Sequence, residues 1–292
     1  MDDQQHLQRT INEKIASHVT EHAWESSIAI VIAHDNAVHQ FGSGILFRVA
    51  DDSFVVTAGH VVKESHKLGK TLGISSATGF FVAVPGQWIC SSDGQYGMDK
   101  DPFDIAIHKL PQDAIGKIGN KTFLRFDDID FDSQSPTTVY TLFGFPGIWS
   151  RPSCSESDKL QLKPFQFTTF AYDRKTDTLH EYQERFHLLL DAQLRYSSIL
   201  DGSPAQFQDL NGNDALFPRD LGGISGCSVW RIGDLNVPIE NWGQERSRIV
   251  AVQTGVYNSA QVIKSTRWVA VSTLIHEAFP ELRTTMQLWR PR

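Results

Sequence analysis

The sequence predicts an all-β protein with a helix at the N-terminus and a short helix at the C-terminus. Runs of β-branched and aromatic residues follow one another after Trp24, and turn-forming residues separate them. These runs fall into two sets of six, divided by an acidic, turn-rich segment, Asp127–Pro136. Many short strands with turns between them are typical of β-barrels or β-sandwiches rather than of a parallel α/β sheet.

The first element is a helix over residues 4–24. Its apolar residues recur at every fourth position with polar residues between them, namely Leu7, Ile11, Ile15 and Val19. We expect this apolar face to pack across the body of the protein. A helix that binds a partner is the alternative.

Twelve strands and a closing helix follow. The first set of strands is Ile28–Ala33, Gly44–Val49, Ser53–Thr57, Phe80–Val84, Ile105–Leu110 and Thr122–Phe126. The second set is Thr138–Phe143, Phe165–Tyr172, Phe186–Leu190, Ser228–Arg231, Arg248–Val256 and Trp268–Ser272. The segment Thr273–Leu282 is expected to close the chain as a short helix.

Composition and charge exclude several classes of protein. The chain has 292 residues and a formal net charge of -7, with no run of Lys or Arg, so we expect no nucleic-acid partner. No apolar stretch approaches the length of a membrane span, so we expect no membrane partner either. The start, Met1–Gln5, lacks the basic and apolar regions of a secretion signal, which favours a cytoplasmic location.

The cysteines favour neither a disulfide framework nor a metal site. There are 3 of them, an odd and sparse set without a CxxC pair. Sparse cysteines also fit a reducing compartment. We therefore expect no metal and no cofactor.

Three short segments carry residues suited to nucleophilic catalysis. Thr57–His60 ends a predicted strand, Asp104 precedes another, and Gly222–Ser228 surrounds Ser225 with glycines. Each alone fits an ordinary structural role, such as a strand end, a turn or a tight loop. Together they supply a nucleophile, a base and a group that orients the base. Glycines beside the nucleophile also allow backbone N–H groups to converge on an oxyanion.

With these segments the sequence resembles the trypsin-like serine peptidase family. The order His, Asp, Ser is that of the chymotrypsin clan and differs from the orders of α/β-hydrolases and subtilisins. The matching motifs are TAGH at Thr57–His60, DIAI at Asp104–Ile107, GISG at Gly223–Gly226, GSGILF at Gly42–Phe47, FGFPG at Phe143–Gly147 and VAVQTG at Val250–Gly255. The resemblance covers about residues 27–278, and its implied subtype is an intracellular bacterial enzyme without a signal peptide.

The resemblance implies a chymotrypsin-like double barrel. Residues 1–26 would form the N-terminal helix, 27–130 the first six-stranded antiparallel barrel, and 131–292 the second, with an inserted loop at 191–220. Such an enzyme would act on a protein or peptide substrate, and a partner protein in a stress or defence system would be its trigger.

The family's site residues carry over to matching positions. His60, Asp104 and Ser225 would form the catalytic triad, and the amides of Gly223 and Ser225 the oxyanion hole. The substrate would contact Arg219, Gln253, Thr254 and Gly255. Arg219, six residues before Ser225, would favour acidic side chains if it points inward. An exposed arginine is the alternative.

Two departures from the family pattern bear on activation and chemistry. Ile224 stands where secreted members have an Asp that pairs with a newly cut N-terminus, so we expect no activation of that kind. Activity would be intrinsic or gated by ordering of the loop at 191–220. Cys227 replaces a glycine and is expected to be a small packed side chain rather than a second nucleophile. A non-catalytic binding module and an esterase with the same triad are the alternative functions.

Overall fold

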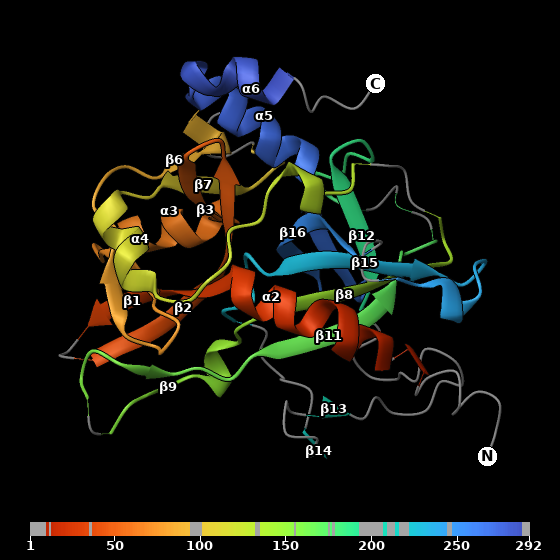
Figure 1. Ribbon diagram of the computed structural model, residues 1–292, viewed down its shortest axis with the longest axis horizontal. Coiled ribbons are helices and arrows are strands. Elements are labelled where there is room, and N and C mark those ends of the chain that lie inside the picture. The colour runs from red at the N-terminus through yellow and green to blue at the C-terminus, as the bar shows by residue number, and fades with distance from the viewer. Residues whose placement is uncertain are drawn as a thin grey trace.

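The computed structural model describes residues 10–11, 13–34, 37–93, 101–131, 135–154, 156–174, 176, 179–192, 207–208, 214–215, 222–243 and 247–287. Its strands form two large antiparallel sheets, with short helices around them (Figure 1). The predicted all-β fold, a chymotrypsin-like double barrel with short helices, is confirmed.

The first sheet has seven strands, not the six predicted, in the order β5-β4-β1-β2-β3-β7-β6. They are β1 (Ser27–His34), β2 (Ala37–Val49), β3 (Asp52–Ala58), β4 (Leu72–Ser75), β5 (Phe81–Ala83), β6 (Ile89–Cys90) and β7 (Ile105–Lys109). Their apolar side chains supply much of the buried core between the sheet and its helices.

The strand predicted at Thr122–Phe126 is wrong. Leu124 makes only an isolated bridge to Phe47, and a 3₁₀ turn, Phe126–Asp128, follows at once. The turn forms because the Asp128 carboxylate accepts the Arg125 backbone N–H at 2.7 Å. The short strands β4 and β6 were not predicted, and they complete the sheet.

The second sheet has six strands in the order β11-β8-β15-β16-β17-β12. They are β8 (Thr138–Gly144), β11 (Phe165–Phe170), β12 (His187–Asp191), β15 (Ser228–Asp234), β16 (Arg248–Tyr257) and β17 (Val262–Arg267). An antiparallel bridge between Ala171 and Leu190 joins its outer strands, so this sheet closes on itself. Two small ribbons complete the strands: β9 (Arg151–Pro152) with β10 (Leu160–Gln161), and β13 (Phe207–Gln208) with β14 (Asp214–Ala215).

The last predicted strand, Trp268–Ser272, is also wrong. The last strand of the chain is β17, which ends at Arg267. Trp268 begins the helix α5 (Trp268–Ala278). Residues Trp268, Val271 and Ile275 recur at helical spacing, and all three are buried in one core cluster. Packing of this face outweighs the β propensity of the sequence WVAV. The chain then continues through a 3₁₀ turn to α6 (Arg283–Gln287).

Each terminal helix packs on the sheet that is remote from it in sequence. The chain is helical at residues 10–11 and 13–26, ending in α2 (Glu21–Ser26), and buries the predicted face at Ile11, Ile15 and Val19. This helix lies against the second sheet, where the His22 and Trp230 ring centroids are 5.1 Å apart (Figure 1). Helix α5 packs on the first sheet, with Phe47 and Trp268 centroids 5.2 Å apart. The two ends of the chain therefore tie the sheets together.

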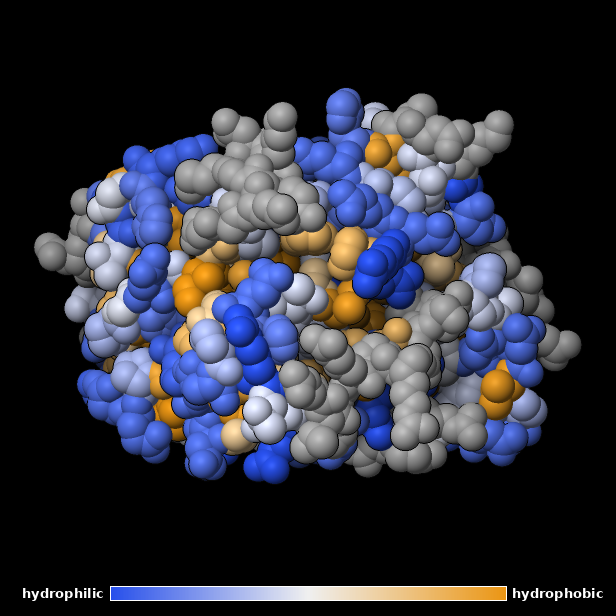
Figure 2. Space-filling model, turned by 90° about the horizontal axis from the view of Figure 1, so that it is seen from above, coloured by the Kyte–Doolittle hydropathy of each residue, from blue (hydrophilic) through white to orange (hydrophobic). Residues whose placement is uncertain are grey.

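The surface on the side of the C-terminal helices is mostly hydrophilic, with smaller hydrophobic areas between (Figure 2). Within the described ranges, the exposed large hydrophobic side chains are Leu68 and Leu235. No helix among the described residues is long and apolar enough to span a bilayer.

Candidate functional site

His60 lies where a strand of the first sheet turns into a helix. Strand β3 ends at Ala58, and α3 (Gly59–Lys67) begins with the next residue. The His60 backbone N–H donates to Asp104 Oδ1 at 2.7 Å, and the Gly59 N–H donates to the Asp104 carbonyl oxygen at 2.6 Å. A Cβ added at Gly59 would lie 3.0 Å from Asp104 Oδ1. The glycine therefore allows the carboxylate to approach the helix start closely.

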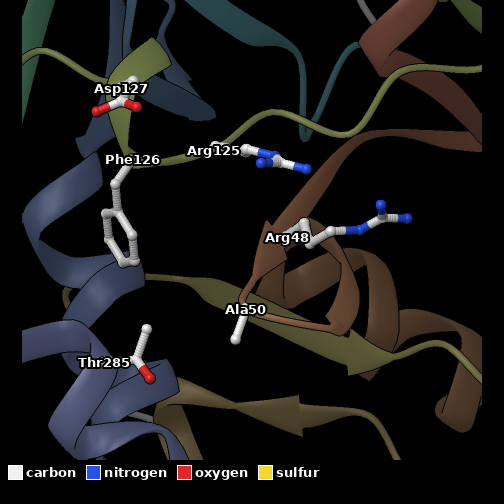
Figure 3. A pocket seen from close by; sticks show the side chains of 6 residues that line it. All are labelled: Arg48, Ala50, Arg125, Phe126, Asp127 and Thr285. Atoms are coloured by element: carbon white, nitrogen blue, oxygen red, sulfur yellow. The ribbon is translucent and has the colours of Figure 1, made fainter.

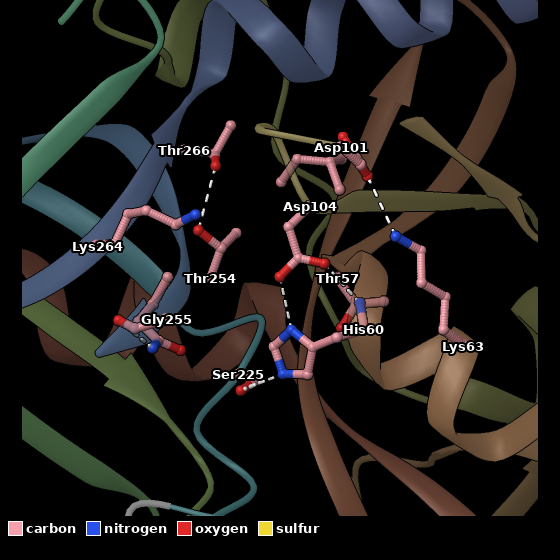
Figure 4. A network of polar contacts seen from close by, with 12 residues as sticks. Thr57, His60, Lys63, Asp101, Asp104, Ser225, Thr254, Gly255, Lys264 and Thr266 are labelled. Atoms are coloured by element: carbon pink, nitrogen blue, oxygen red, sulfur yellow. Dashed lines mark hydrogen bonds and ion pairs between the residues drawn. The ribbon is translucent and has the colours of Figure 1, made fainter. Parts of the chain in front are cut away.

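Asp104 is held in an unusual backbone conformation just before β7. Its φ of 51° lies in the left-handed region, which Asp tolerates better than most residues. Asp101 supports the segment, because its Oδ1 accepts the Phe103 N–H at 3.1 Å and its Oδ2 accepts the Ser91 hydroxyl at 2.7 Å. The Ile105 N–H donates back to Ser91 Oγ at 3.0 Å. These bonds orient the Asp104 carboxylate toward His60 (Figure 4).

The three predicted residues come together at hydrogen-bonding distance. His60 Nδ1 lies 2.6 Å from Asp104 Oδ2, and His60 Nε2 lies 2.8 Å from Ser225 Oγ (Figure 4). Burial alone would lower the pKa of His60, but the hydrogen bond and negative charge of Asp104 outweigh it and leave the pKa raised. A neutral imidazole here donates from Nδ1 to Asp104 and accepts the Ser225 hydroxyl at Nε2.

Ser225 sits on a tight turn between the two sheets. The Ser43 N–H donates to the Ser225 carbonyl oxygen, and the Gly226 N–H donates to the Gln253 carbonyl oxygen, both at 2.8 Å. Gly226 has a φ of +92°, and a Cβ there would lie 2.0 Å from the Ser43 carbonyl oxygen. Only glycine fits at this position.

The peptide before Gly223 is oriented by the loop after β8. The Gly222 carbonyl oxygen accepts the Gly147 N–H at 2.8 Å, so in this trans peptide the Gly223 N–H points the opposite way. Within the described part of the chain, neither the Gly223 N–H nor the Ser225 N–H has an acceptor. Two unpartnered donors beside Ser225 suit the binding of an oxyanion.

Two polar residues of β2, which sequence reasoning missed, hold this loop. Gln40 Nε2 donates to the Gly223 carbonyl oxygen at 2.9 Å, and Ser43 Oγ lies 3.0 Å from the same oxygen. Ser43 Oγ also accepts the Phe145 N–H at 2.9 Å. Ser43 belongs to the GSG segment noted in the sequence, but no local pattern identifies Gln40 as a contact of a distant loop.

Cys227 is a packed side chain, as expected. It is buried, and burial raises the pKa of its thiol to about 12. A Cβ at Gly144 would lie 1.9 Å from Cys227 Sγ, so the sulfur fills the space over that glycine. A protonated thiol in such a place is a poor nucleophile.

Three of the four predicted substrate residues, Gln253, Thr254 and Gly255, lie on β16, next to Ser225. Gln253 and Thr254 are buried, and Gln253 Nε2 donates to the Gly255 carbonyl oxygen at 3.1 Å. The Oε1 atom of Gln253 is buried and has no partner among the described residues. Arg219 lies outside the described residues, as does most of the predicted loop 191–220.

Nothing else in the described ranges offers a competing centre. They contain no group of three or more His, Cys, Asp or Glu side chains that could hold a metal ion. A small pocket between the first sheet and the C-terminal helices is lined by Arg48, Ala50, Arg125, Phe126, Asp127 and Thr285 (Figure 3). It contains none of the three residues that converge at Ser225, so we assign no chemistry to it.

The comparisons with known proteins find similar structures but no similar sequence. By sequence, the chain matches no protein-family model and no curated protein. By structure, it is similar to a Glu endopeptidase, with a TM-score of 0.46 and 14% identity over 87% of this chain and 90% of that one. It is also similar to the thermostable serine protease AL20 from an extremophilic microorganism (TM-score 0.47, 13% identity, 87% and 96% covered). A third is the serine protease domain of the Sesbania mosaic virus polyprotein (TM-score 0.44, 16% identity, 85% and 90% covered). At such identities and TM-scores the likeness concerns the arrangement of the strands alone.

Proposed function

We propose that the protein is a serine endopeptidase that cleaves peptide bonds through an acyl-enzyme. The observation that carries the proposal is the line of hydrogen bonds from Asp104 Oδ2 through His60 to Ser225 Oγ, with distances of 2.6 and 2.8 Å. This arrangement joins an orienting carboxylate, a base and a nucleophile in the order that acyl transfer requires.

Each residue has a separate role in the proposed reaction. Ser225 Oγ attacks the carbonyl carbon of the substrate while His60 Nε2 takes the hydroxyl proton. Asp104 stabilises the imidazolium and keeps Nε2 directed at Ser225. The tetrahedral intermediate collapses as His60 returns the proton to the leaving amine. Water then repeats the sequence on the acyl-enzyme and releases the acid.

The negative charge on the tetrahedral intermediate needs donors that are already in place. The N–H groups of Gly223 and Ser225 would supply them, because both lack acceptors among the described residues. Loss of one such donor costs about 3 kcal/mol of transition-state stabilisation. Orientation of the Gly223 N–H therefore matters as much as the triad.

The strand β16 offers a means of binding an extended peptide. Its pairing with β15 ends at Val252, so from Thr254 to Tyr257 it pairs, within the described residues, only with β17. A peptide that adds to the open edge at Thr254 and Gly255 would carry its scissile bond to Ser225. Backbone pairing of this kind supports a peptide substrate over a simple ester.

Labelling with a fluorophosphonate tests the proposal directly. We expect wild-type protein to be labelled once, Ser225→Ala protein to remain unlabelled, and the control Ser153→Ala to be labelled like wild type. Casein and a nitrophenyl ester, assayed in parallel, separate an endopeptidase from an esterase. Labelling that is absent from wild type, or that persists in Ser225→Ala, would contradict the proposal and favour a non-catalytic module.

A further inference from the structure

Lys264 is a buried cation with a poor partner. The residue is 8% exposed, and its ammonium lies 4.0 Å from Glu181 Oε2, on a side chain that is 53% exposed. No closer acceptor exists among the described residues. An ammonium removed from water without a close anion is unfavourable, so such a group is a candidate for binding an anion.

The side chain of Lys264 lies beside the open edge of β16. Lys264 is the cross-strand partner of Gly255, and a Cβ added at Gly255 would lie 3.7 Å from Lys264 Cε. Because residue 255 has no side chain, nothing from that position of β16 covers the stem of Lys264. Figure 4 shows the Lys264 side chain ending next to Thr254.

Hydrogen bonds fix this part of the second sheet to the segment that holds Asp104. The Thr254 and Thr266 hydroxyls are 3.2 Å apart, and Thr266 Oγ1 donates to the Phe103 carbonyl oxygen at 2.6 Å. Since Asp104 follows Phe103 directly, Lys264 has a defined position relative to the triad. The cation is therefore anchored near the proposed reaction centre rather than on a remote surface.

A neighbouring histidine does not compete for an anion. His187 Nε2 donates to the Pro102 carbonyl oxygen at 2.7 Å, and its Nδ1 accepts the Gln183 N–H at 2.8 Å. Both ring nitrogens are thus used by a neutral imidazole. The positive charge of Lys264, by contrast, has no closer acceptor than Glu181 among the described residues.

Strand alternation decides which substrate side chain would meet Lys264. Residues directly opposite one another in adjacent strands project to the same face of a sheet. A peptide residue paired with Gly255 would therefore place its side chain on the face of Lys264. Because the chain from Gly255 to Gln253 leads toward Ser225, that residue lies on the amino side of the scissile bond, between positions P2 and P4.

We propose that Lys264 is a specificity residue that binds a carboxylate side chain of the peptide substrate at one position from P2 to P4. The inference rests on the proposed endopeptidase function and names its substrate class, a peptide with Asp or Glu before the cleaved residue. The substrate carboxylate would approach from the edge of the sheet and replace Glu181 as the partner of the Lys264 ammonium.

Matched peptides test the inference by changing one charge at a time. Peptides with Asp, Asn or Lys at each of P2, P3 and P4 are compared by kcat/KM. We expect wild type to prefer Asp over Asn about tenfold or more at one position. Lys264→Met should remove the preference, Lys264→Arg should retain it, and Lys264→Glu should favour Lys. The control Lys117→Glu makes the same charge change at an exposed site and should leave the preference unchanged.

A binding assay separates this inference from the proposed function. Fluorescence anisotropy of the same labelled peptides on Ser225→Ala protein requires no turnover, and Asp peptides should bind more tightly than Asn peptides. Failure of wild type to cleave any peptide would contradict the endopeptidase function, and the binding assay would then decide the role of Lys264. Equal binding of Asp and Asn peptides at every position would overturn the inference. Thermal unfolding of each variant checks that it is folded.

Discussion

The side-chain amide of Gln40 donates to the carbonyl oxygen of Gly223 at 2.9 Å, and so ties the loop before Ser225 to a strand of the other sheet. The same nitrogen lies 2.7 Å from the Gly42 carbonyl oxygen and 2.5 Å from that of Phe145. In secreted members of the trypsin-like family that the sequence resembles, an Asp at the matching position would hold this loop through a new N-terminus. Here Ile224 is buried, and the side chain of Gln40 contacts the loop instead.

Gln40→Ala should therefore lower kcat while leaving KM nearly unchanged. Removal of the amide takes one donor from the Gly223 carbonyl oxygen, which keeps Ser43 Oγ, and loosens the peptide that directs the Gly223 N–H. We expect kcat to fall about 100-fold, near the effect of losing one oxyanion donor. Steady-state kinetics on a peptide substrate measure both parameters.

Two further variants sharpen this test. Gln40→Glu places acceptors against the same carbonyl oxygens, so it should be at least as damaging as alanine. His39→Ala alters the exposed neighbour on β2 and should behave like wild type. An unchanged kcat in Gln40→Ala would show that the loop holds its conformation without the clamp.

The pH dependence of kcat/KM should reflect the charge of His60. The base must be neutral to accept the Ser225 proton, so activity rises as pH increases through the His60 pKa. Asp104 raises that pKa against the effect of burial. We therefore expect the midpoint of this rise in kcat/KM to lie above the ordinary histidine pKa of about 6.5. A midpoint at or below that value would contradict the coupling between His60 and Asp104.

Asp104→Asn should move the midpoint of the pH profile to lower pH and slow the reaction. An amide lacks the negative charge that raises the His60 pKa, so burial then dominates and the midpoint moves to lower pH. It can also donate to Nδ1 and favour the wrong tautomer, which costs about 10⁴-fold in kcat in serine proteases of this type. The rate of fluorophosphonate labelling across pH reports both effects. A variant with full activity would remove Asp104 from the proposed mechanism.

Residues in short local motifs were the ones that sequence could locate. His60, Asp104 and Ser225 each stand beside a strand end or a glycine turn, and the structure brings all three together. Gln40 could not be found this way, because its partners Phe145 and Gly223 are 105 and 183 residues away along the chain. Its role exists only once the two sheets are packed together.

Lys264 and α5 were missed for related reasons. The register of β16 and β17 shifts between Gln253 and Gly255, and this bulge sets Lys264 opposite a glycine. Alternation counted along the sequence does not predict the shift. In α5, local propensity favours a strand, but the buried face of Trp268, Val271 and Ile275 decides for a helix.

Close packing under Ser225 should make Gly144 intolerant of a side chain. A Cβ there would lie 1.9 Å from Cys227 Sγ and 3.1 Å from Cys227 Cβ. Gly144→Ala should therefore destabilise the protein by about 1–3 kcal/mol, as expected for overpacking. Urea unfolding measures the change, and Gly116→Ala is the control, since a Cβ at Gly116 meets no atom within 4 Å.

A double-mutant cycle identifies the sulfur as the cause. Cys227→Ala removes Sγ, so Gly144→Ala should cost less in that background than in wild type, and the two changes should not add. The rescue should be partial, because the Cβ of residue 227 remains close. Strictly additive effects would mean that the strand or loop moves to relieve the contact. In that case the turn at Ser225 would be less rigid than an oxyanion site with fixed donors requires.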